Sequence, residues 1–345
     1  MQGKKAELLS RPIRHIDIKR HDTRALVEAF SQMSFSAREL GEACALYERM
    51  LRDPGCAVIL TVAGSTSAAG CMQVYVDLVR HNMVDAVVAT GATVVDMDFL
   101  EALGFKHYRG TQFADDSELR ELYVDRIYDT YIDEEELQQC DLTIREIADG
   151  LEPRPYSSRE FIAEMGRWLK AHPERAHKQD SLVQVAFEQD VPIFVPAFSD
   201  CSAGFGLVAH QVGQPERHLS IDSVRDFREL TELKLAQKDT GLLIIGGGAP
   251  KNFAQDTVVC AEILGEEVPM HKYSIQITVA DVRDGACSSS TLKEAGSWGK
   301  VDAAGEQMVF AEASLALPIL AGHAWHSGAW RERKPRRLAK VFARA

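Results

Sequence analysis

The stretch KEAGSWGK at residues 293–300 places an amine next to an aromatic ring. Lys300 follows Trp298, and Glu294 and Asp284 stand earlier along the chain. A lysine forms an imine only as the free amine, so the pKa of such a lysine must be lowered by burial or by neighbouring cations. Trp298 would exclude water and face a substrate cation, and the two acids would hold ammonium groups. A lone lysine is more often a solvated surface charge, so this chemistry depends on the surrounding elements.

Five short apolar runs rich in Val, Ile and Ala predict buried parallel strands, and segments with helical spacing separate them. The expected strands cover residues 56–64, 85–92, 191–200, 240–248 and 273–281. Two of the helical segments cover residues 70–82 and 252–264. This alternation is typical of an α/β fold with a doubly wound parallel sheet and helices on both faces.

Small residues and polar turns mark the carboxyl ends of these strands, in AGSTSAAG, ATGATVVD, FSDCSAGFG and GGGAPKN. Ligands of doubly wound sheets lie beyond these ends, so the four loops predict one cleft. The N–H groups of GGGAPKN could face a phosphate, but tight strand-to-helix turning explains three glycines nearly as well. In the same way, Asp200 is either a ligand-facing acid or a helix N-cap.

The 345 residues are 46% hydrophobic and 26% charged, as in a globular protein with a sizeable core. The net charge of −12 argues against nucleic acid as the main partner and is compatible with cationic small molecules, although solubility alone also explains it. No apolar run is long enough to span a membrane, and the N-terminus lacks a secretory signal. Seven scattered cysteines without a CxxC pair predict reduced thiols in the cytoplasm and no metal site.

The chain is expected to form one domain with additions. Residues 1–50 would be an N-terminal helical extension, and residues 51–325 would hold the sheet. A mostly helical insertion is expected at about 105–180. Residues 326–345 form a basic tail, for which we expect a frayed, solvated segment, with an arm for an anionic partner as the alternative.

Several of these stretches together resemble the deoxyhypusine synthase family. HNMVD stands before the second strand, PIFVPAFSDCSAGFG looks like the family's strand that ends in Asp, and LLIIGGGAPKN resembles its triple-glycine turn. EAGSWGK looks like the family's lysine motif, and FAEASLALPIL like its closing segment. The similarity runs in order from about residue 50 to 320, which is more ordered agreement than chance provides.

The resemblance implies a Rossmann-like, NAD-binding fold, usually in a homotetramer with active sites at subunit interfaces. Family members are transferases of polyamine metabolism. They oxidise spermidine with NAD, carry its aminobutyl group on a lysine as an imine, and pass it to an acceptor amine. That acceptor is a lysine of a translation factor or, in homospermidine synthases, putrescine. A short N-terminal helix can cover a neighbour's active-site entrance; packing of residues 11–30 on their own domain is the alternative.

The resemblance also assigns residues. Lys300 matches the catalytic lysine, and Asp284, Glu294 and Trp298 are expected to bind the substrate. Asp96 or Glu312 would accept a hydrogen bond from a ribose hydroxyl. The positions that match the family's cofactor residues are Gly64, Ser65, Thr90, Asp96, Asp200, Gly246, Gly247, Gly248, Glu312 and Ala313.

Three positions on the substrate side depart from the family's pattern. Phe205 stands where the family has an aspartate that helps to bind spermidine, Asn252 replaces a histidine, and Cys287 replaces the second acid of DGSD. A lost charged hydrogen-bond partner costs about 1.5–3 kcal/mol, so two such losses would remove most discrimination for spermidine. Asn252 also cannot act as a general base. The resemblance therefore predicts the type of reaction but not the identity of the amine donor.

Two other functions stay open. A Cys287 thiolate beside Asp284 would attack an electrophilic carbon, such as the guanidinium carbon of an agmatine-like substrate, and the protein would then be a hydrolase. An inert buried thiol is the simpler interpretation of Cys287. The other function is an NAD-binding or assembly protein without catalysis, against which the complete EAGSWGK string argues.

Overall fold

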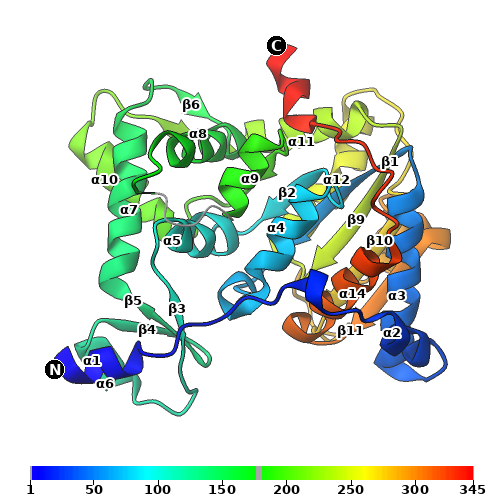
Figure 1. Cartoon of the computed structure of the whole chain (residues 1–345). Helices are drawn as coiled ribbons and strands as arrows, with labels where there is room; N and C mark the ends of the chain where they lie inside the picture. Colours follow the sequence, from blue (N-terminus) through cyan, green and yellow to red (C-terminus); the bar gives the residue numbers. More distant parts are fainter. Residues whose placement is uncertain (1, 176–180, 345) are drawn as a thin grey trace.

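Six parallel strands form the central sheet of the computed structural model, which describes residues 2–175 and 181–344 (Figure 1). All five expected strands are present, each shorter than its apolar run. The sixth strand, β11, lies at an edge and was not predicted. The strands, in their order across the sheet, are β11 (Glu306–Phe310), β10 (Tyr273–Thr278), β9 (Asp239–Ile245), β1 (Cys56–Val62), β2 (Ala86–Ala89) and β7 (Ile193–Phe194).

The strand order reverses direction at β1. The chain moves outward from β1 through β2 to β7, and then returns to the other side of β1 with β9, β10 and β11. Ile59 of β1 pairs with Ala86 of β2 and with Leu242 of β9, so this strand is hydrogen-bonded on both sides. The carboxyl ends of β1 and β9 therefore flank the switch point where such sheets bind ligands.

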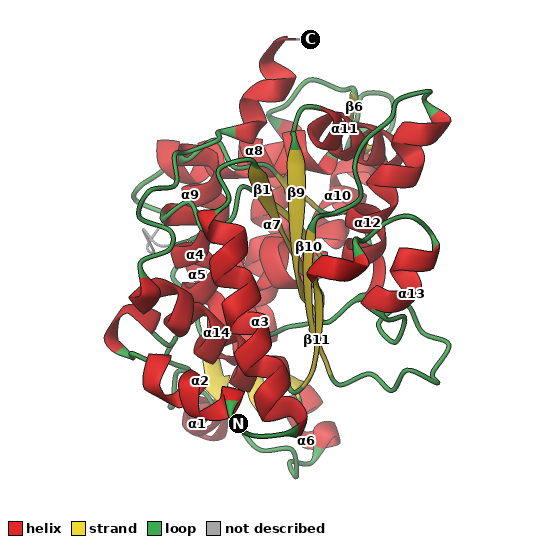
Figure 2. Ribbon diagram, turned by 90° about the vertical axis from the view of Figure 1, so that its right-hand side faces the viewer, coloured by secondary structure: helices red, strands yellow, loops and turns green. Residues whose placement is uncertain are grey.

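Alternate residues of β1 enter two separate cores. Val58 and Leu60 belong to the core that α3 and α14 cover, whereas Ala57 and Ile59 face α11 and α12. Figure 2 shows helices on both sides of the sheet, as predicted. The helices are α1 (Gln2–Leu8), α2 (Arg24–Ser31), α3 (Phe35–Arg52), α4 (Met72–Arg80), α5 (Phe99–Ala102), α6 (Asp116–Glu121), α7 (Glu134–Asp149), α8 (Ser158–Ala171), α9 (Leu182–Glu188), α10 (Ser202–Gly213), α11 (Ser223–Leu235), α12 (Gly248–Ile263), α13 (Leu292–Ser297) and α14 (Ala313–Ser327).

The insertion expected at 105–180 contains helices together with a small sheet that was not expected. It contains an antiparallel sheet of β3 (His107–Arg109), β5 (Thr130–Asp133) and β4 (Val124–Ile127) before the long helices α7 and α8. A two-stranded sheet pairs β6 (Pro155–Tyr156) with β8 (Ser220–Ile221). Residues 176–180 of the expected insertion lie outside the described residues. The sequence did not reveal these short strands. The acidic side chains on the surface of α7, which follows them directly, obscured their alternation of apolar and polar residues.

The expected N-terminal extension contributes directly to the core. Helix α3 buries Leu40, Cys44 and Tyr47, and it packs against β1, β10 and β11. The Tyr47 hydroxyl donates to the carbonyl of Met83, 3.0 Å away, before β2. Residues 35–52 are therefore a structural layer of the main unit.

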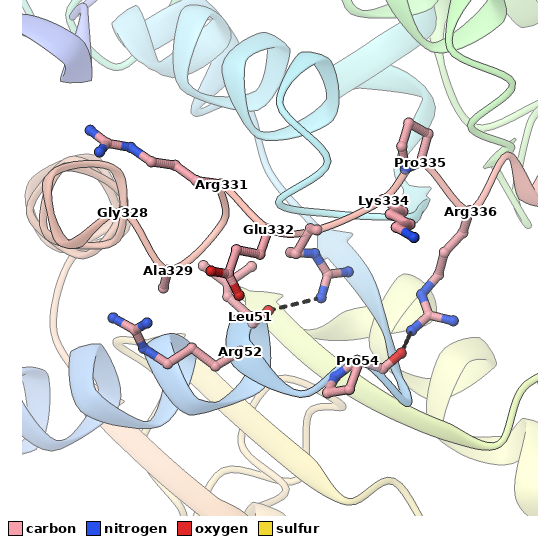
Figure 3. Close-up of a pocket in the computed structure, with 11 residues that line it drawn as sticks. Leu51, Arg52, Pro54, Gly328, Ala329, Arg331, Glu332, Lys334, Pro335 and Arg336 are labelled. Carbon is pink, nitrogen blue, oxygen red and sulfur yellow. Dashed lines mark hydrogen bonds between the residues drawn. The ribbon is translucent and has the colours of Figure 1, made fainter.

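The expectation of a frayed, solvated C-terminal tail is wrong for the described residues. Arg333 is 6% exposed and pairs with Asp85 at 2.5 Å, and Leu338 is buried. Figure 3 shows residues 328–336 as a strap over Leu51 and Pro54, with Arg336 donating to the Pro54 carbonyl at 2.7 Å. The basic residues of this strap pack against the end of the sheet because the buried carboxylate of Asp85 requires a cationic partner.

Candidate active site

A glycine turn at the end of α13 directs Lys300 toward the sheet. Thr291 caps the helix by accepting from the Glu294 N–H, and the helix ends at Ser297. Gly299 has φ of +71°, a conformation that side chains rarely tolerate, and it reverses the chain. The Lys300 carbonyl then accepts from the His271 N–H at 2.9 Å, which anchors the turn beside β10.

The amine of Lys300 is held between an acid and an aromatic ring. Its Nζ lies 2.5 Å from Asp256 Oδ1 and 5.1 Å from the centre of the Trp298 ring. The Lys300 side chain is 16% exposed, whereas Trp298 is 66% exposed. The lysine is thus shielded from bulk water, but its partner is Asp256. The acids expected near it were Glu294 and Asp284.

Helix α12 supplies three polar groups to this site. Asn252 and Asp256 are one helical turn apart and therefore point the same way. Lys251 is fully buried beside them, and its Nζ donates to the carbonyl and the hydroxyl of Ser290, each at 2.7 Å. The helix begins directly after the triple glycine, so the turn that ends β9 also positions these side chains.

Lys251 is the lysine of this site whose pKa is depressed. Burial lowers the pKa of Lys251 to about 8, and the neighbouring charge of Lys300 acts in the same direction. Cys287 and Glu294 also lie close to Lys251, and their charges act against this lowering of its pKa. Lys251 is therefore a second lysine of this site that is shielded from water, in addition to Lys300.

Cys287 lies in the exposed loop between β10 and α13. The amide of Asn252 donates to its Sγ over 3.3 Å, so the structure brings together these two positions that depart from the family pattern. The inert buried thiol that is the simpler interpretation of Cys287 does not fit, because this thiol is exposed. Asp284 is also exposed and accepts from the Ala286 N–H at 3.2 Å, which shapes the loop.

The triple glycine fastens this loop to the sheet. A Cβ on Gly247 would lie 2.5 Å from Cα of Ser288, so only glycine permits this approach. The side-chain amide of Gln276 bridges the carbonyls of Gly246 and Ser288, at 2.9 and 3.1 Å. The glycines thus position Cys287 in addition to turning the chain.

The loops after β1 and β9 leave backbone open at the switch point. Gly64 and Gly248 have φ of +92° and +64°, and a Cβ built on either would meet no atom closer than 4 Å. The Gly64 carbonyl accepts from the Thr93 hydroxyl at 2.5 Å, and Thr93 in turn contacts the hydroxyl of Thr90. Accessible backbone in this position fits a dinucleotide, whose phosphates require close approach to main-chain atoms.

Two acids expected to meet a ribose already have structural roles. Asp96 is buried and accepts from the N–H groups of Ser202 and Ala203, at 3.0 and 2.9 Å. Glu312 caps α14 by accepting from Ser314 and Leu315. A ribose hydroxyl would compete with these bonds. Asp200, by contrast, is exposed, and the N-cap position of α10 belongs to its neighbour Cys201.

Phe205 does not lie near Lys300 within one chain. It is on α10, which follows the edge strand β7, whereas α13 packs on β10 and β11 at the opposite edge. Five strand spacings separate these edges, or about 24 Å. The Phe205 side chain is 68% exposed. One chain therefore joins Lys300 to Asn252 and Cys287, but not to Phe205.

Sequence reasoning missed Asp256 and Lys251. The available signal was the four-residue spacing from Asn252 to Asp256 in a helical segment, which places two polar groups on one face. Lys251 has no such signal, because its burial depends on the packing of α12. Within the described residues, no group of three or more His, Cys, Asp or Glu side chains is arranged to hold a metal ion. No helix in that part of the chain could span a membrane.

Comparison with known proteins identifies the family. The deoxyhypusine synthase family model matches residues 25–324. A deoxyhypusine synthase-like protein of Coxiella burnetii is 64% identical over 99% of this chain and 97% of its own length. A Caulobacter vibrioides protein of the same name is 59% identical over 99% of this chain and 94% of its own. The chain belongs to the deoxyhypusine synthase family.

More distant relatives agree with this assignment. A Methanosarcina mazei protein named "Probable deoxyhypusine synthase 2" is 40% identical over 95% of this chain and 92% of its own. A solved deoxyhypusine synthase homologue of Entamoeba histolytica shares the fold, with a TM-score of 0.59 at 17% identity over 91% of this chain and 97% of that one.

Proposed function

We propose that the protein is a cytoplasmic, NAD-dependent transferase that moves an aminoalkyl group from a polyamine, such as spermidine, to an acceptor amine through an imine on Lys300. One observation carries the proposal. The Lys300 amine is shielded from solvent and held by groups suited to cationic amines, the carboxylate of Asp256 and the ring of Trp298. Membership of the deoxyhypusine synthase family supports a transferase, and aminobutyl transfer is the general activity of that family.

The Asp256 carboxylate links substrate binding to the activation of Lys300. While the Asp256 carboxylate pairs with it, the Lys300 amine is not free to attack a substrate carbon. A cationic donor that pairs with Asp256 would release the Lys300 amine from this ion pair. As the free base, that amine forms a C–N bond to the oxidised donor carbon, while the bond from this carbon to the donor's own nitrogen breaks and the departing amine takes the proton. The acceptor amine later displaces Lys300 from the same carbon.

The cofactor would lie at the switch point. Gly64, Ser65 and the glycines 246–248 would present backbone to its phosphates, and Thr90 and Asp200 would offer polar side chains. NAD supplies a hydride acceptor for the carbon next to the donor nitrogen and returns the hydride at the end. The open glycine turns support this placement.

We further propose that the active site is completed by a second copy of the chain, in a homotetramer. Phe205 and Lys300 are on opposite edges of one sheet, so both line one site only if the edges of two subunits meet. The exposed apolar residues Phe205, Val208 and Val212 form one face of α10, which is consistent with a subunit contact.

Trapping of the imine tests this proposal. The protein is incubated with NAD and spermidine, putrescine, agmatine or aminopropylagmatine, reduced with borohydride and digested, and the adduct is located by mass spectrometry. We expect a mass increase on the peptide that contains Lys300, dependent on both NAD and amine. Nucleotide binding without an adduct from any of the four amines would reject the transferase. The released products identify the donor, and a putrescine acceptor would indicate a homospermidine synthase-like reaction.

A hydrolase of a guanidino substrate is the second candidate. The hydrogen bond from Asn252 to the exposed Cys287 thiol favours it, because a nucleophilic thiol needs access and a fixed orientation. The experiment is agmatine turnover by Cys287→Ser, with Cys260→Ser, a partly buried thiol on α12, as the control. Full turnover by Cys287→Ser would remove this candidate.

A further inference from the structure

The N-terminal segment and the small antiparallel sheet enclose a polar cavity of about 780 Å³ at the carboxyl ends of the strands. Arg11 and Arg14 of the segment and Arg109 of β3 line it, and Asp129 is the one carboxylate in its lining. Ala69, in the loop after β1, and Ser314, at the start of α14, form part of its wall. The cavity therefore adjoins two of the loops to which the cofactor is assigned.

Hydrogen bonds fix the backbone of the arginines. The Arg109 N–H donates to the Arg11 carbonyl at 2.7 Å, and the Ile13 N–H donates to the His107 carbonyl at 2.8 Å. The segment thus pairs with β3 through one isolated antiparallel bridge, between Pro12 and Tyr108. Farther along, the Ile16 N–H donates to the Gly70 carbonyl at 3.0 Å. Because the main chain is anchored on both sides of Arg14, a ligand need not order the backbone when it binds.

None of the three guanidinium groups has an ion-pair or hydrogen-bond partner in the part of the chain that the structure describes. Three cations against one carboxylate repel one another unless an anion joins them. Guanidinium groups match phosphate oxygens in geometry and bind them with paired hydrogen bonds. Nearby Glu312 does not supply that anion to the arginines, because its oxygens accept from the first turn of α14.

The basic groove at the other end of the sheet shows the contrasting case. It measures about 680 Å³ and lies under the C-terminal strap (Figure 3). Most of its guanidinium groups already have partners: Arg333 pairs with Asp85, Arg336 donates to the Pro54 carbonyl, and Arg52 pairs with Glu48. Those arginines bind partners within the protein, whereas the guanidinium groups of the first cavity have no such partner in the described chain.

We propose that Arg11, Arg14 and Arg109 form a binding site for a phosphate-bearing ligand. Two sources of that phosphate fit the position. One is the diphosphate of the dinucleotide, and this source alone rests on the proposed function. The other is a separate phosphorylated molecule that binds beside the cofactor.

Calorimetry with inorganic pyrophosphate tests the site itself, on the full chain and at two salt concentrations. We expect Arg14→Gln/Arg109→Gln to weaken binding by at least tenfold, since each lost guanidinium removes charged hydrogen bonds, and added salt to weaken wild-type binding. Arg331→Gln/Lys334→Gln is the matched control, because it removes two charges from the other basic groove. Thermal unfolding verifies that both variants fold, and Arg11→Gln alone serves as a milder third variant.

Titration of NAD and of nicotinamide riboside, which has no phosphate, separates the sources. If Arg14→Gln/Arg109→Gln weakens the binding of NAD but not that of the riboside, the bound phosphate is that of the dinucleotide. If it weakens pyrophosphate alone, the ligand is a separate phosphorylated molecule. Absent pyrophosphate binding in the wild type, or an equal loss in both double variants, would overturn the site.

Discussion

Lys251 and Lys300 belong to one site but experience opposite surroundings. Burial lowers the pKa of Lys251 to about 8, and Ser290 occupies its amine, so it loses its proton easily but no substrate reaches it. Lys300 is held by Asp256 at the edge of the site, where a substrate can meet it. The difference shows that a low pKa alone does not identify a nucleophile. Access matters as well, and the buried amine of Lys251, which donates to Ser290, lacks it.

Removal of the Lys300 amine should have the largest effect. For Lys300→Ala, we expect aminoalkyl transfer to fall by on the order of a thousandfold or more, because the covalent carrier is lost. Product formation measured by mass spectrometry checks this, with Lys293→Ala, an exposed lysine of α13, as the control. If Lys300→Ala retained an adduct on Lys251, the roles assigned to the two lysines would be reversed.

The buried lysine should instead appear in the pH dependence of stability. The pKa of Lys251 is about 8 in the folded chain and near 10.5 when unfolded, so the unfolded state binds more protons between these values. The free energy of unfolding should therefore rise as the pH increases from 8 to 10.5, with about 2 kcal/mol from this residue. Urea unfolding at several pH values measures it.

Lys251→Met is the control for that measurement, because it keeps the volume and removes the titrating group. The free energy of unfolding of this variant should rise less between pH 8 and 10.5 than that of the wild type. A buried lysine elsewhere, Lys234, has a pKa also lowered to about 8 by burial and contributes the rise that remains. Identical pH profiles for the two proteins would contradict the burial of a titrating amine at position 251.

Loss of the Asp256 carboxylate should make Lys300 more reactive. In Asp256→Asn the ion pair that occupies the amine is removed, so we expect about fivefold faster labelling of Lys300 by a small aldehyde and borohydride at pH 7.5. The effect is limited to about 1 kcal/mol because the Asp256 side chain is 38% exposed and water screens the pair. Glu294→Gln serves as the control. Slower labelling in Asp256→Asn would mean that the carboxylate does not restrain the amine.

The smallest effect should come from the ring of Trp298. Because this ring is largely exposed, its attraction for an ammonium group is worth about 0.5–1 kcal/mol. For Trp298→Leu, we expect KM for the amine donor to rise two- to fivefold with little change in kcat. Trp298→Phe, which keeps a π face, should lie between Leu and the wild type. A large fall in kcat would instead assign Trp298 to the exclusion of water.

Much of the fold could be predicted because its signals are local. Apolar runs such as 56–64 and 240–248 predict buried parallel strands, and both are found in the sheet centre. Strand β11 was missed because its sequence, EQMVF, has only three apolar residues and lies at the sheet edge. The short strands of the small sheet were hidden in an acidic segment, and their pairing depends on partners distant in the sequence.

The sequence by itself determined the family and five of the six strands of the central sheet, because strings such as EAGSWGK and the apolar runs are properties of neighbouring residues. Only the tertiary structure decided that Asp256 meets Lys300, that Lys251 is buried, and that Phe205 lies at the opposite edge of the sheet. Burial and ion pairing depend on which elements pack together. Those contacts join residues far apart in the chain, so no local pattern records them.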